Sequence, residues 1–283
     1  MKRKKIEERF FIILMMLSTF LIVGTLIFLV MVILVKGFTS LSLDMITQVP
    51  KGGFYFGKEG GILNAIVGSF YLAIGATLFA FIISLPAALF MNIYFTGHLK
   101  VLEYIRFFLD LLWGVPSIVY GAFGFAVMIL VGLRASLLAG IITVTLLIIP
   151  IMIRAMDEVL RTIPFGLLET SYSLGSTKTE ISFKVFFKQA LPGIVTAILL
   201  AFGRGIGDAA SVLFTAGYTD YIPQSILQPT ATLPLAIFFQ LSSPILEVRE
   251  RAYASSVILT LIILIISILT RVLTKKFKEY IIS

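Results

Sequence analysis

Long uninterrupted apolar runs are the feature that most constrains what this chain can fold into. The first extends over residues 10–35, which exceeds the roughly 20 apolar residues that a helix needs to cross a membrane. A cleaved signal peptide has a shorter apolar core, of about 7–15 residues, that ends in small residues. This run ends at Lys36, and only 13% of the whole chain is charged, which is too little polar surface for a water-soluble globule. We therefore expect an all-α integral membrane protein.

Five further apolar stretches predict five more spans, and hence six transmembrane helices. They are expected at 63–94, from near Trp113 to about 131, from 135 to about 156, at 192–214 and from 253 to about 272. Pro86 can kink the second span without ending it, because neighbouring helices satisfy the carbonyl that a proline leaves free. Trp113 is expected at the membrane interface. Residues 233–241 are too few to cross as a helix and are expected to be re-entrant or interfacial.

The distribution of positive charge orients these spans. If the N-terminus lies inside, sixteen of the 23 lysines and arginines fall on inner segments, six on outer segments and one, Arg204, within a span. The positive-inside rule then places both the N- and C-termini in the cytoplasm. The same topology accounts for the net charge of +8, so a nucleic-acid partner is not indicated.

Residues that metal sites and thiol enzymes need are scarce. The chain has no cysteine and a single histidine, His98, which is interpreted as a solvated loop residue. A disulfide framework and thiol catalysis are excluded, and neither a metal site nor a catalytic residue is predicted. Residues 52–59 (GGFYFGKE) have the glycine spacing and lysine of a P-loop, but Glu59 stands where Ser or Thr must hold magnesium. This segment is interpreted as an outer loop.

The inner loop 157–191 begins with the pattern of a short helix. Pro164 suits the first helical residue, since its missing N–H would have no partner there. Three apolar residues then recur on one helical face: Phe165, Leu168 and Tyr172.

A second short helix is predicted directly after the first. Gly175 can adopt the left-handed conformation that ends a helix, and residues 177–180 (TKTE) have the form of a capping box that begins the next. An apolar stripe outside the bilayer is stabilised by docking onto a partner, or by lying on the membrane or on the bundle's own base. The residues alone leave both interpretations open.

An arginine is expected near the middle of the fifth span. Arg204 lies twelve residues beyond Pro192, or roughly 18 Å along a helix, in a hydrocarbon core about 30 Å thick. A charge there costs on the order of 3 kcal/mol, so it should face the protein interior or an aqueous path and have a partner. Asp208, one turn further on, is that partner. Gly203 and Gly207 are expected to form a small-residue seam for close helix packing.

Two roles for the Arg204–Asp208 pair stay open. The planar guanidinium of Arg204 can give two charge-assisted hydrogen bonds to a tetrahedral oxyanion while remaining charged, which suits an anion path. Asp208 would then hold the guanidinium in place and weaken anion binding, so that the ion passes on. Alternatively, the two form an i,i+4 salt bridge with a purely structural role.

Several motifs resemble those of ABC importer permeases. Glu169-Thr170-Ser171 followed by Gly175 has the spacing of that family's EAA loop, with both alanines replaced. Four segments resemble the PstA type of phosphate permease: 114–121 (GVPSIVYG), 203–208 (GRGIGD), 213–217 (LFTAG) and 233–238 (LPLAIF). Asp208 stands where the family commonly has glutamate.

The resemblance implies a transport subunit, not an enzyme, with a type I-like ABC permease fold in the plasma (inner) membrane of a prokaryote. Its parts would be an N-terminal helix and external loop (1–62), a permease core (63–273) with the cytoplasmic coupling loop 157–191, and a basic tail (274–283). It would bind no cofactor itself. Within the lipid bilayer it would form a heterodimer with a sister permease.

The resemblance also implies partners outside the bilayer. A cytoplasmic ATPase dimer would bind ATP and Mg²⁺, and an extracytoplasmic protein would deliver phosphate. Glu169, Thr170, Ser171 and Gly175 would form the ATPase-coupling loop, and Arg204 with Asp208 the substrate path.

Other functions stay open at this point. The nearest are a permease for another oxyanion, such as sulfate or molybdate, and the sister phosphate subunit. A different class is a stand-alone ion-coupled secondary transporter, in which Asp208 relays protons beside Arg204. A membrane enzyme is the weakest hypothesis, because no nucleophile, metal cluster or further acid–base pair is assembled.

Overall fold

Helices dominate the part of the chain that the computed structural model describes, which is residues 2–51, 59–95, 97 and 99–278. Five helices are long and apolar enough to take part in crossing a membrane: α1 (Lys2–Phe38), α3 (Leu63–Ile93), α6 (Leu137–Leu160), α9 (Phe187–Ile206) and α11 (Leu246–Lys278). The shorter elements are α2 (Leu43–Thr47), β1 (Pro50–Lys51), β2 (Glu59–Gly60), α4 (Leu99–Gly114), α5 (Ser117–Leu130), α7 (Phe165–Ser173), α8 (Lys178–Glu180), the π-helix η1 (Ile181–Phe186) and α10 (Leu233–Leu241). The P-loop-like residues 52–58 and His98 lie outside the described residues.

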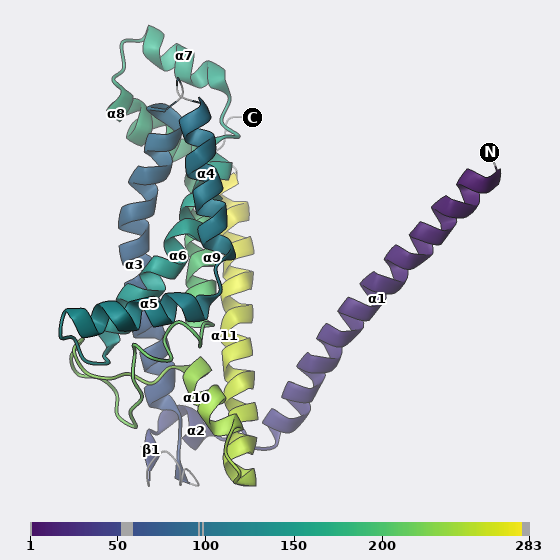
Figure 1. Cartoon of the computed structure of the whole chain (residues 1–283), viewed down its shortest axis with the longest axis vertical. Helices are drawn as coiled ribbons and strands as arrows, with labels where there is room; N and C mark the ends of the chain where they lie inside the picture. The colour runs from purple at the N-terminus through teal and green to yellow at the C-terminus, as the bar shows by residue number, and fades with distance from the viewer. Residues whose placement is uncertain (1, 52–58, 96, 98, 279–283) are drawn as a thin grey trace.

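The long helices of the bundle run along one axis (Figure 1). Helices α7 and α8 lie at one end, and α2, β1 and α10 lie toward the other. The first turns of α1 and the last turns of α11 lie toward the end that carries α7, which agrees with the orientation predicted from the lysines and arginines. We call the α7 end cytoplasmic and the opposite end outer.

The third span is broken. Helix α5 starts at 93° to α4 and lies across the bundle (Figure 1). Pro116 disfavours a helical conformation at the residue before it and has no N–H to continue the helix. At the break the hydroxyl of Tyr120 donates a hydrogen bond to the carbonyl of Leu112 at 2.9 Å. The prediction of one continuous helix is therefore wrong, and Trp113 lies in the last turn of α4 beside the bend.

The fifth span begins and ends earlier than predicted. Helices α8, η1 and α9 form one continuous span, Lys178–Ile206, so Pro192 lies inside a helix and not at its start. The chain leaves the helix at Gly207, and the carboxylate of Asp208 then accepts a hydrogen bond from the backbone N–H of Ser211 at 2.8 Å. Such a side-chain bond replaces the helical pairing of that N–H. The expected continuation of the helix to residue 214 is wrong.

The remaining helices differ from expectation mainly at their ends. The fourth span is α6, which runs past the predicted end at 156 to Leu160. The sixth is α11, which begins at Leu246 and not at 253, and extends to Lys278. The nine residues 233–241 form the short helix α10, whose first N–H donates to Ser69 of α3 at 2.8 Å. As predicted, α10 does not span.

Between α9 and α10 the chain passes through the bundle without regular helices or strands. Its carbonyls accept hydrogen bonds from the first backbone N–H groups of α6 and from the residue before it. The pairs are Ser136 with Thr215 (2.9 Å), Leu137 with Gln228 (2.8 Å) and Leu138 with Ile226 (2.8 Å). Irregular backbone at membrane depth is tolerated where protein satisfies its polar groups. This segment therefore satisfies the N–H groups at the start of α6, beside the N-cap residue Ser136.

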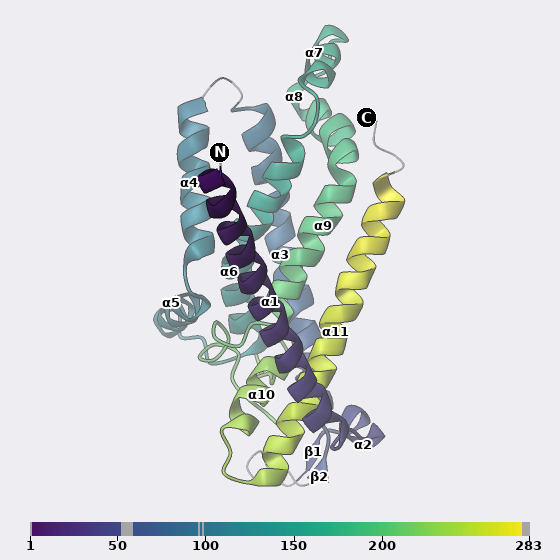
Figure 2. The same cartoon turned by 90° about the vertical axis from the view of Figure 1, so that its right-hand side faces the viewer.

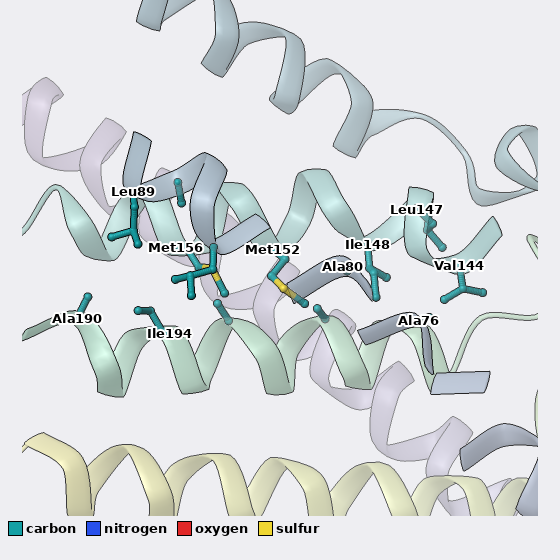
Figure 3. Close-up of a cluster of buried hydrophobic side chains, with 14 of the residues drawn as sticks. Ala76, Ala80, Leu89, Val144, Leu147, Ile148, Met152, Met156, Ala190 and Ile194 are labelled. Carbon is teal, nitrogen blue, oxygen red and sulfur yellow. The ribbon is translucent and has the colours of Figure 1, made fainter. Parts of the chain in front are cut away.

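The core lies where α3, α6 and α9 pack together (Figure 3). Helix α9 contributes mainly alanines, α3 contributes alanines and larger apolar residues in similar numbers, and α6 contributes larger residues. The buried set includes Ala76, Ala80, Ala88, Val144, Ile148, Met152, Met156, Ala190, Ile194, Ala197 and Ala201. Small residues let membrane helices approach closely, so that van der Waals packing holds them together.

The glycines of α9 test this packing. A methyl group at Gly193 would collide with the branched side chain of Val159 on α6, whereas no atom lies within 4 Å of the corresponding position at Gly203. We expect Gly193→Ala to destabilise the chain by about 1–3 kcal/mol through overpacking. Gly203→Ala should be neutral, or stabilising by up to about 1 kcal/mol through helix propensity. Thermal unfolding of the purified chain in detergent measures both, and an unchanged melting temperature for Gly193→Ala would contradict the described contact of α6 with α9.

Candidate functional site

The predicted coupling loop forms two short helices joined by a tight turn at the cytoplasmic end (Figure 1). Pro164 is the N-cap of α7, one position before the first helical residue. Gly175 has φ of +77°, as predicted for a left-handed C-terminal residue. Its N–H donates to the carbonyl of Tyr172 at 2.9 Å, and the N–H of Ser176 donates to that of Ser171 at 3.1 Å. These two bonds form a Schellman motif, which fixes the direction in which the chain leaves α7.

The capping box at the start of α8 is present as predicted. The N–H of Glu180 donates to the hydroxyl of Thr177 at 3.3 Å, and the Glu180 carboxylate accepts from the N–H of Thr177 at 3.1 Å. Lys184 adds an ion pair to the same carboxylate at 2.9 Å. Both ends of the turn between α7 and α8 are therefore held by local hydrogen bonds.

The apolar stripe of α7 is divided between two surroundings. Leu168 is 4% exposed and belongs to the core formed by α3, α6 and α9. Phe165 is 64% exposed, and Leu174, just after the helix, is 81% exposed. The helix thus rests on the bundle through Leu168 and presents other apolar side chains outward.

The residues that replace the two alanines of the EAA pattern keep their hydroxyls bonded within α7. Thr170 donates to the carbonyl of Gly166 at 2.7 Å, and Ser171 donates to that of Leu167 at 2.6 Å. Ser171 is nearly buried, whereas Glu169, Thr170 and Gly175 are exposed. Three of the four predicted docking residues are therefore on the surface.

The second predicted site, Arg204 with Asp208, lies at the end of α9. Nη1 of Arg204 is 2.9 Å from Oδ1 of Asp208, and Oδ2 of the same carboxylate accepts from the N–H of Ser211 at 2.8 Å. The Asp208 side chain is 3% exposed, but that of Arg204 is 44% exposed. The carboxylate is held inside the protein, while the guanidinium reaches out of it.

The predicted glycine seam is open in this chain. No atom lies within 4 Å of a methyl position at Gly203, and the nearest side-chain atom at Gly207 belongs to Ile263, at 3.8 Å. The close glycine contacts of α9 lie instead at Gly193, against Val159, and at Gly205, 3.2 Å from Val144. The role of the seam in helix packing stays a prediction, and it concerns a surface that this chain leaves uncovered.

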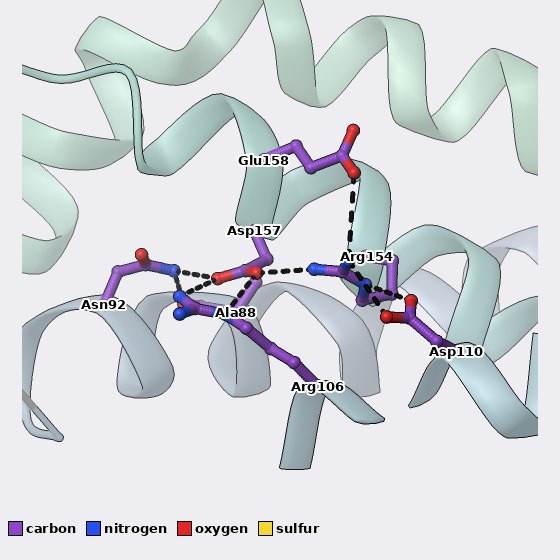
Figure 4. Close-up of polar contacts among 7 residues, drawn as sticks. All are labelled: Ala88, Asn92, Arg106, Asp110, Arg154, Asp157 and Glu158. Carbon is purple, nitrogen blue, oxygen red and sulfur yellow. Dashed lines mark hydrogen bonds and ion pairs between the residues drawn. The ribbon is translucent and has the colours of Figure 1, made fainter. Parts of the chain in front are cut away.

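A third polar site was missed at the level of the sequence (Figure 4). Asp157, near the end of α6, is completely buried. Its carboxylate accepts two hydrogen bonds from Arg106 of α4, at 2.8 and 2.9 Å, and one from Asn92 of α3, at 2.9 Å. Arg154 bridges Asp157, 3.0 Å away, to Asp110 of α4. We call these five residues the Asp157 cluster.

The Asp157 cluster ties α3, α4 and α6 together beside the coupling loop. Arg106 and Arg154 are among the positive charges assigned to inner segments, and both are engaged in ion pairs here. The available signal was the set of charged residues within α4 and near the end of α6, since such charges need partners at membrane depth. The chain reaches the start of α7 only eight residues after Asp157. A short connection therefore joins α7 to the end of α6 that the cluster holds.

No group of three or more His, Cys, Asp or Glu side chains that could hold a metal ion occurs among the residues that the structure describes.

Comparison with known proteins identifies the family. Residues 84–279 match the family model of the binding-protein-dependent transport system inner membrane component. The phosphate transport system permease protein PstA of Yersinia pestis is 34% identical over 247 residues, which cover 86% of this chain and 82% of that protein. This chain belongs to the PstA permeases. The corresponding protein of Haemophilus influenzae is 31% identical over 239 residues, 84% of this chain and 83% of its own length.

A solved structure shares the fold of this PstA permease. A chain of the MetNI methionine ABC transporter, in an inward-facing conformation, superposes with a TM-score of 0.62 at 18% identity, over 76% of this chain and 95% of its own. The predicted ABC importer permease fold is thereby confirmed, with the third of six spans broken. As a PstA permease, the chain is a multi-pass transport subunit of the inner membrane, not an enzyme. Permeases of this family work with an ATPase and a binding protein.

The Asp157 cluster gives a prediction for this permease. Asp157→Asn removes the anionic partner of two arginines while keeping the shape of the side chain. We expect a loss of stability of about 3 kcal/mol or more, because breaking a buried ion pair leaves charge without compensation. Thermal unfolding of the purified permease measures it.

Glu158→Gln is the matched control for this experiment. Glu158 is 65% exposed and lies 3.9 Å from Arg154, so its loss should cost less than about 0.5 kcal/mol. If the two variants unfolded at the same temperature, the Asp157 cluster would not hold the helices together.

Proposed function

We propose that this chain is the permease subunit of an ATP-driven phosphate importer, and that Arg204 contacts the anion on its path. The observation that carries the proposal is the unequal exposure of the ion pair: Asp208 is buried, while Arg204 is nearly half exposed. A guanidinium has five N–H donors, and a single carboxylate oxygen engages Nη1 here. The donors that remain can bind a tetrahedral oxyanion with charge-assisted hydrogen bonds. The PstA relatives, which are named as phosphate permeases, support phosphate as that anion.

Asp208 has two tasks in this proposal. It fixes the turn after α9 through Ser211, and it fixes the position of Arg204 through Oδ1. It also lowers the net positive charge near the path. Phosphate is then attracted without being held, which transport requires.

A second permease is proposed to complete the path. The apolar window of α1 has no buried residue, and the helix stands away from the bundle in Figure 1 and lies in front of it in the view turned by 90° (Figure 2). The open glycines of α9, Gly203 above all, likewise present an uncovered surface. A sister permease packed against these surfaces would enclose Arg204 between two chains.

The cytoplasmic partner is proposed to bind at α7. Phe165 and Leu174 are exposed apolar side chains at the end of the molecule, and Glu169 lies between them in sequence. An ATPase that binds ATP and Mg²⁺ would bury them in a groove and push on α7 as it closes. Leu168 and the Asp157 cluster would pass this movement to α6, and η1 would pass it to α9. The far end of α9 carries Arg204.

The substrate proposal is tested by uptake in proteoliposomes that contain the complex with both permeases, the ATPase and the binding protein. We expect ATP-dependent uptake of labelled phosphate that a tenfold excess of sulfate or molybdate leaves unchanged. Arg204→Gln should reduce uptake by at least about tenfold, since a hydrogen bond to a charged group contributes on the order of 1.5–3 kcal/mol.

Three outcomes would contradict this proposal. Normal uptake by an assembled Arg204→Gln complex would rule out the contact with the anion. Strong competition by sulfate would indicate that the transported substrate is another oxyanion. Uptake by this chain alone, without an ATPase, would indicate a secondary transporter.

The coupling loop is tested by ATPase activity and co-purification. Gly175→Ala forces a left-handed residue to carry a side chain, which costs about 1 kcal/mol and disturbs the exit from α7. We expect this variant and Glu169→Ala to weaken binding of the ATPase several-fold, or to let the ATPase hydrolyse ATP in the absence of phosphate. Glu158→Gln, an exposed acid outside α7, is the control. Wild-type coupling in both α7 variants would exclude this docking role.

A further inference from the structure

A cavity of about 330 Å³ lies between α1 and α11 at the outer end of the molecule. Six residues line it: Lys36, Thr39, Leu246, Arg249, Glu250 and Tyr253. Its volume is about ten times the ~30 Å³ that one water molecule occupies in the liquid. The space is therefore large enough for a polar group with several non-hydrogen atoms.

The position of this cavity follows from the way α1 meets α11. A methyl group at Gly37 would lie 2.6 Å from the carbonyl oxygen of Tyr253 and 2.5 Å from Val257, so only glycine allows this close crossing. Beside the crossing, the ammonium group of Lys36 lies 5.0 Å from the centre of the Tyr253 ring. From there α1 diverges from the bundle toward the cytoplasmic end (Figure 1). The cavity lies at the point where the two helices are held together.

The charges around the cavity favour an anion. Among the described residues, neither Lys36 nor Arg249 makes an ion pair, and both are exposed. Arg251 is engaged elsewhere, since it donates to the carbonyl of Gly60 at 2.7 Å. Glu250 adds one negative charge to the lining, so the three ionised side chains carry a net charge of about +1. A singly charged anion suits this lining better than a doubly charged one.

The membrane depth of the cavity indicates which anion this is. The apolar run of α1 ends at Val35, directly before Lys36, and the apolar part of α11 begins after Arg251. Tyrosine, lysine and arginine at the ends of apolar helices lie at the level of the lipid headgroups. A phospholipid phosphodiester carries a single negative charge and is present at this depth in every membrane. Free inorganic phosphate is partly doubly charged at neutral pH, whereas a phosphodiester has no second proton to lose.

We propose that this cavity binds the phosphate group of a membrane phospholipid, held by Lys36 of α1 and Arg249 of α11. Glu250 faces the polar end of the headgroup, and the acyl chains extend along the apolar surfaces of the two helices. The bound lipid then braces α1 against the bundle. The site lies at the outer end of the molecule, apart from Arg204, and does not depend on the proposed transport of phosphate.

Native mass spectrometry of the delipidated complex, titrated with phosphatidylglycerol, tests the proposal. We expect the double variant Lys36→Gln/Arg249→Gln to bind the tightest phosphatidylglycerol at least about tenfold more weakly than wild type, since each cation near an anionic lipid contributes about a fivefold factor. Arg249→Gln alone should fall between the two. Lys51→Gln removes an outer positive charge away from the cavity and should bind as wild type does.

Two ligand controls complete the experiment. Diacylglycerol, which lacks the phosphate, should neither bind measurably nor raise the melting temperature, whereas phosphatidylglycerol should raise it for wild type and Lys51→Gln but not for the double variant. Equal lipid binding by wild type and the double variant would overturn the proposal, as would equal binding of diacylglycerol. Displacement of the lipid by millimolar inorganic phosphate would overturn the lipid assignment in favour of a free-phosphate site. Transport activity enters none of these readouts.

Discussion

The bilayer offers no water to backbone N–H and C=O groups, so every departure from helix inside it needs a partner from the protein. Two departures shape this molecule. At the bend between α4 and α5, Tyr120 supplies a hydroxyl to the carbonyl of Leu112. After α9, the irregular segment gives its carbonyls to the first turn of α6 and its Ser211 N–H to Asp208. The hydrogen bonds that satisfy the polar groups at these two breaks also place α5 and Arg204 part-way along the axis of the bundle.

The small residues of α9 give the bundle its other constraint. Alanines and Gly193 bring α9 so close to α6 that neither helix can shift along the other without a change of side-chain packing. The coupling loop connects these same two helices. A force on α7 is thus applied at both of its ends to a pair of helices that are already packed tightly. Rigid movement of the pair is favoured over bending of the loop, because the Schellman motif and the capping box leave the loop little freedom.

Local chemistry could be predicted from the sequence, and tertiary chemistry could not. The left-handed Gly175 and the capping box at Thr177 depend on residues within one turn of each other, and both are present. The membrane spans could be predicted for the same reason, because each apolar run is a continuous stretch of sequence. The break at Pro116 was missed because a proline in a membrane helix is compatible with a kink as well as with a break. The packing of α5 against α6 and against residues 210–211 decides between these outcomes, and these segments lie elsewhere in the chain.

The Asp157 cluster illustrates this limit most clearly. Each of its members is an ordinary charged or polar residue near the end of a predicted helix, and single arginines there are typical of the positive-inside pattern. Only the packing of α3 against α6 and of α4 against α6 brings Asn92 and Arg106 to one carboxylate. Arg106 and Asn92 lie 51 and 65 residues before Asp157, and contacts between residues so far apart leave no recognisable pattern in a single sequence.

The Arg204–Asp208 pair was predicted as a unit, but the two residues differ in their surroundings. A pair that served only to neutralise two membrane charges would be complete with the contact between the two groups. Here the carboxylate is enclosed and uses both oxygens, one for the guanidinium and one for the turn at Ser211. If Asp208 were present to balance Arg204, it would not need the bond to the turn. The arrangement is the one expected when a carboxylate holds an arginine in position for a third group.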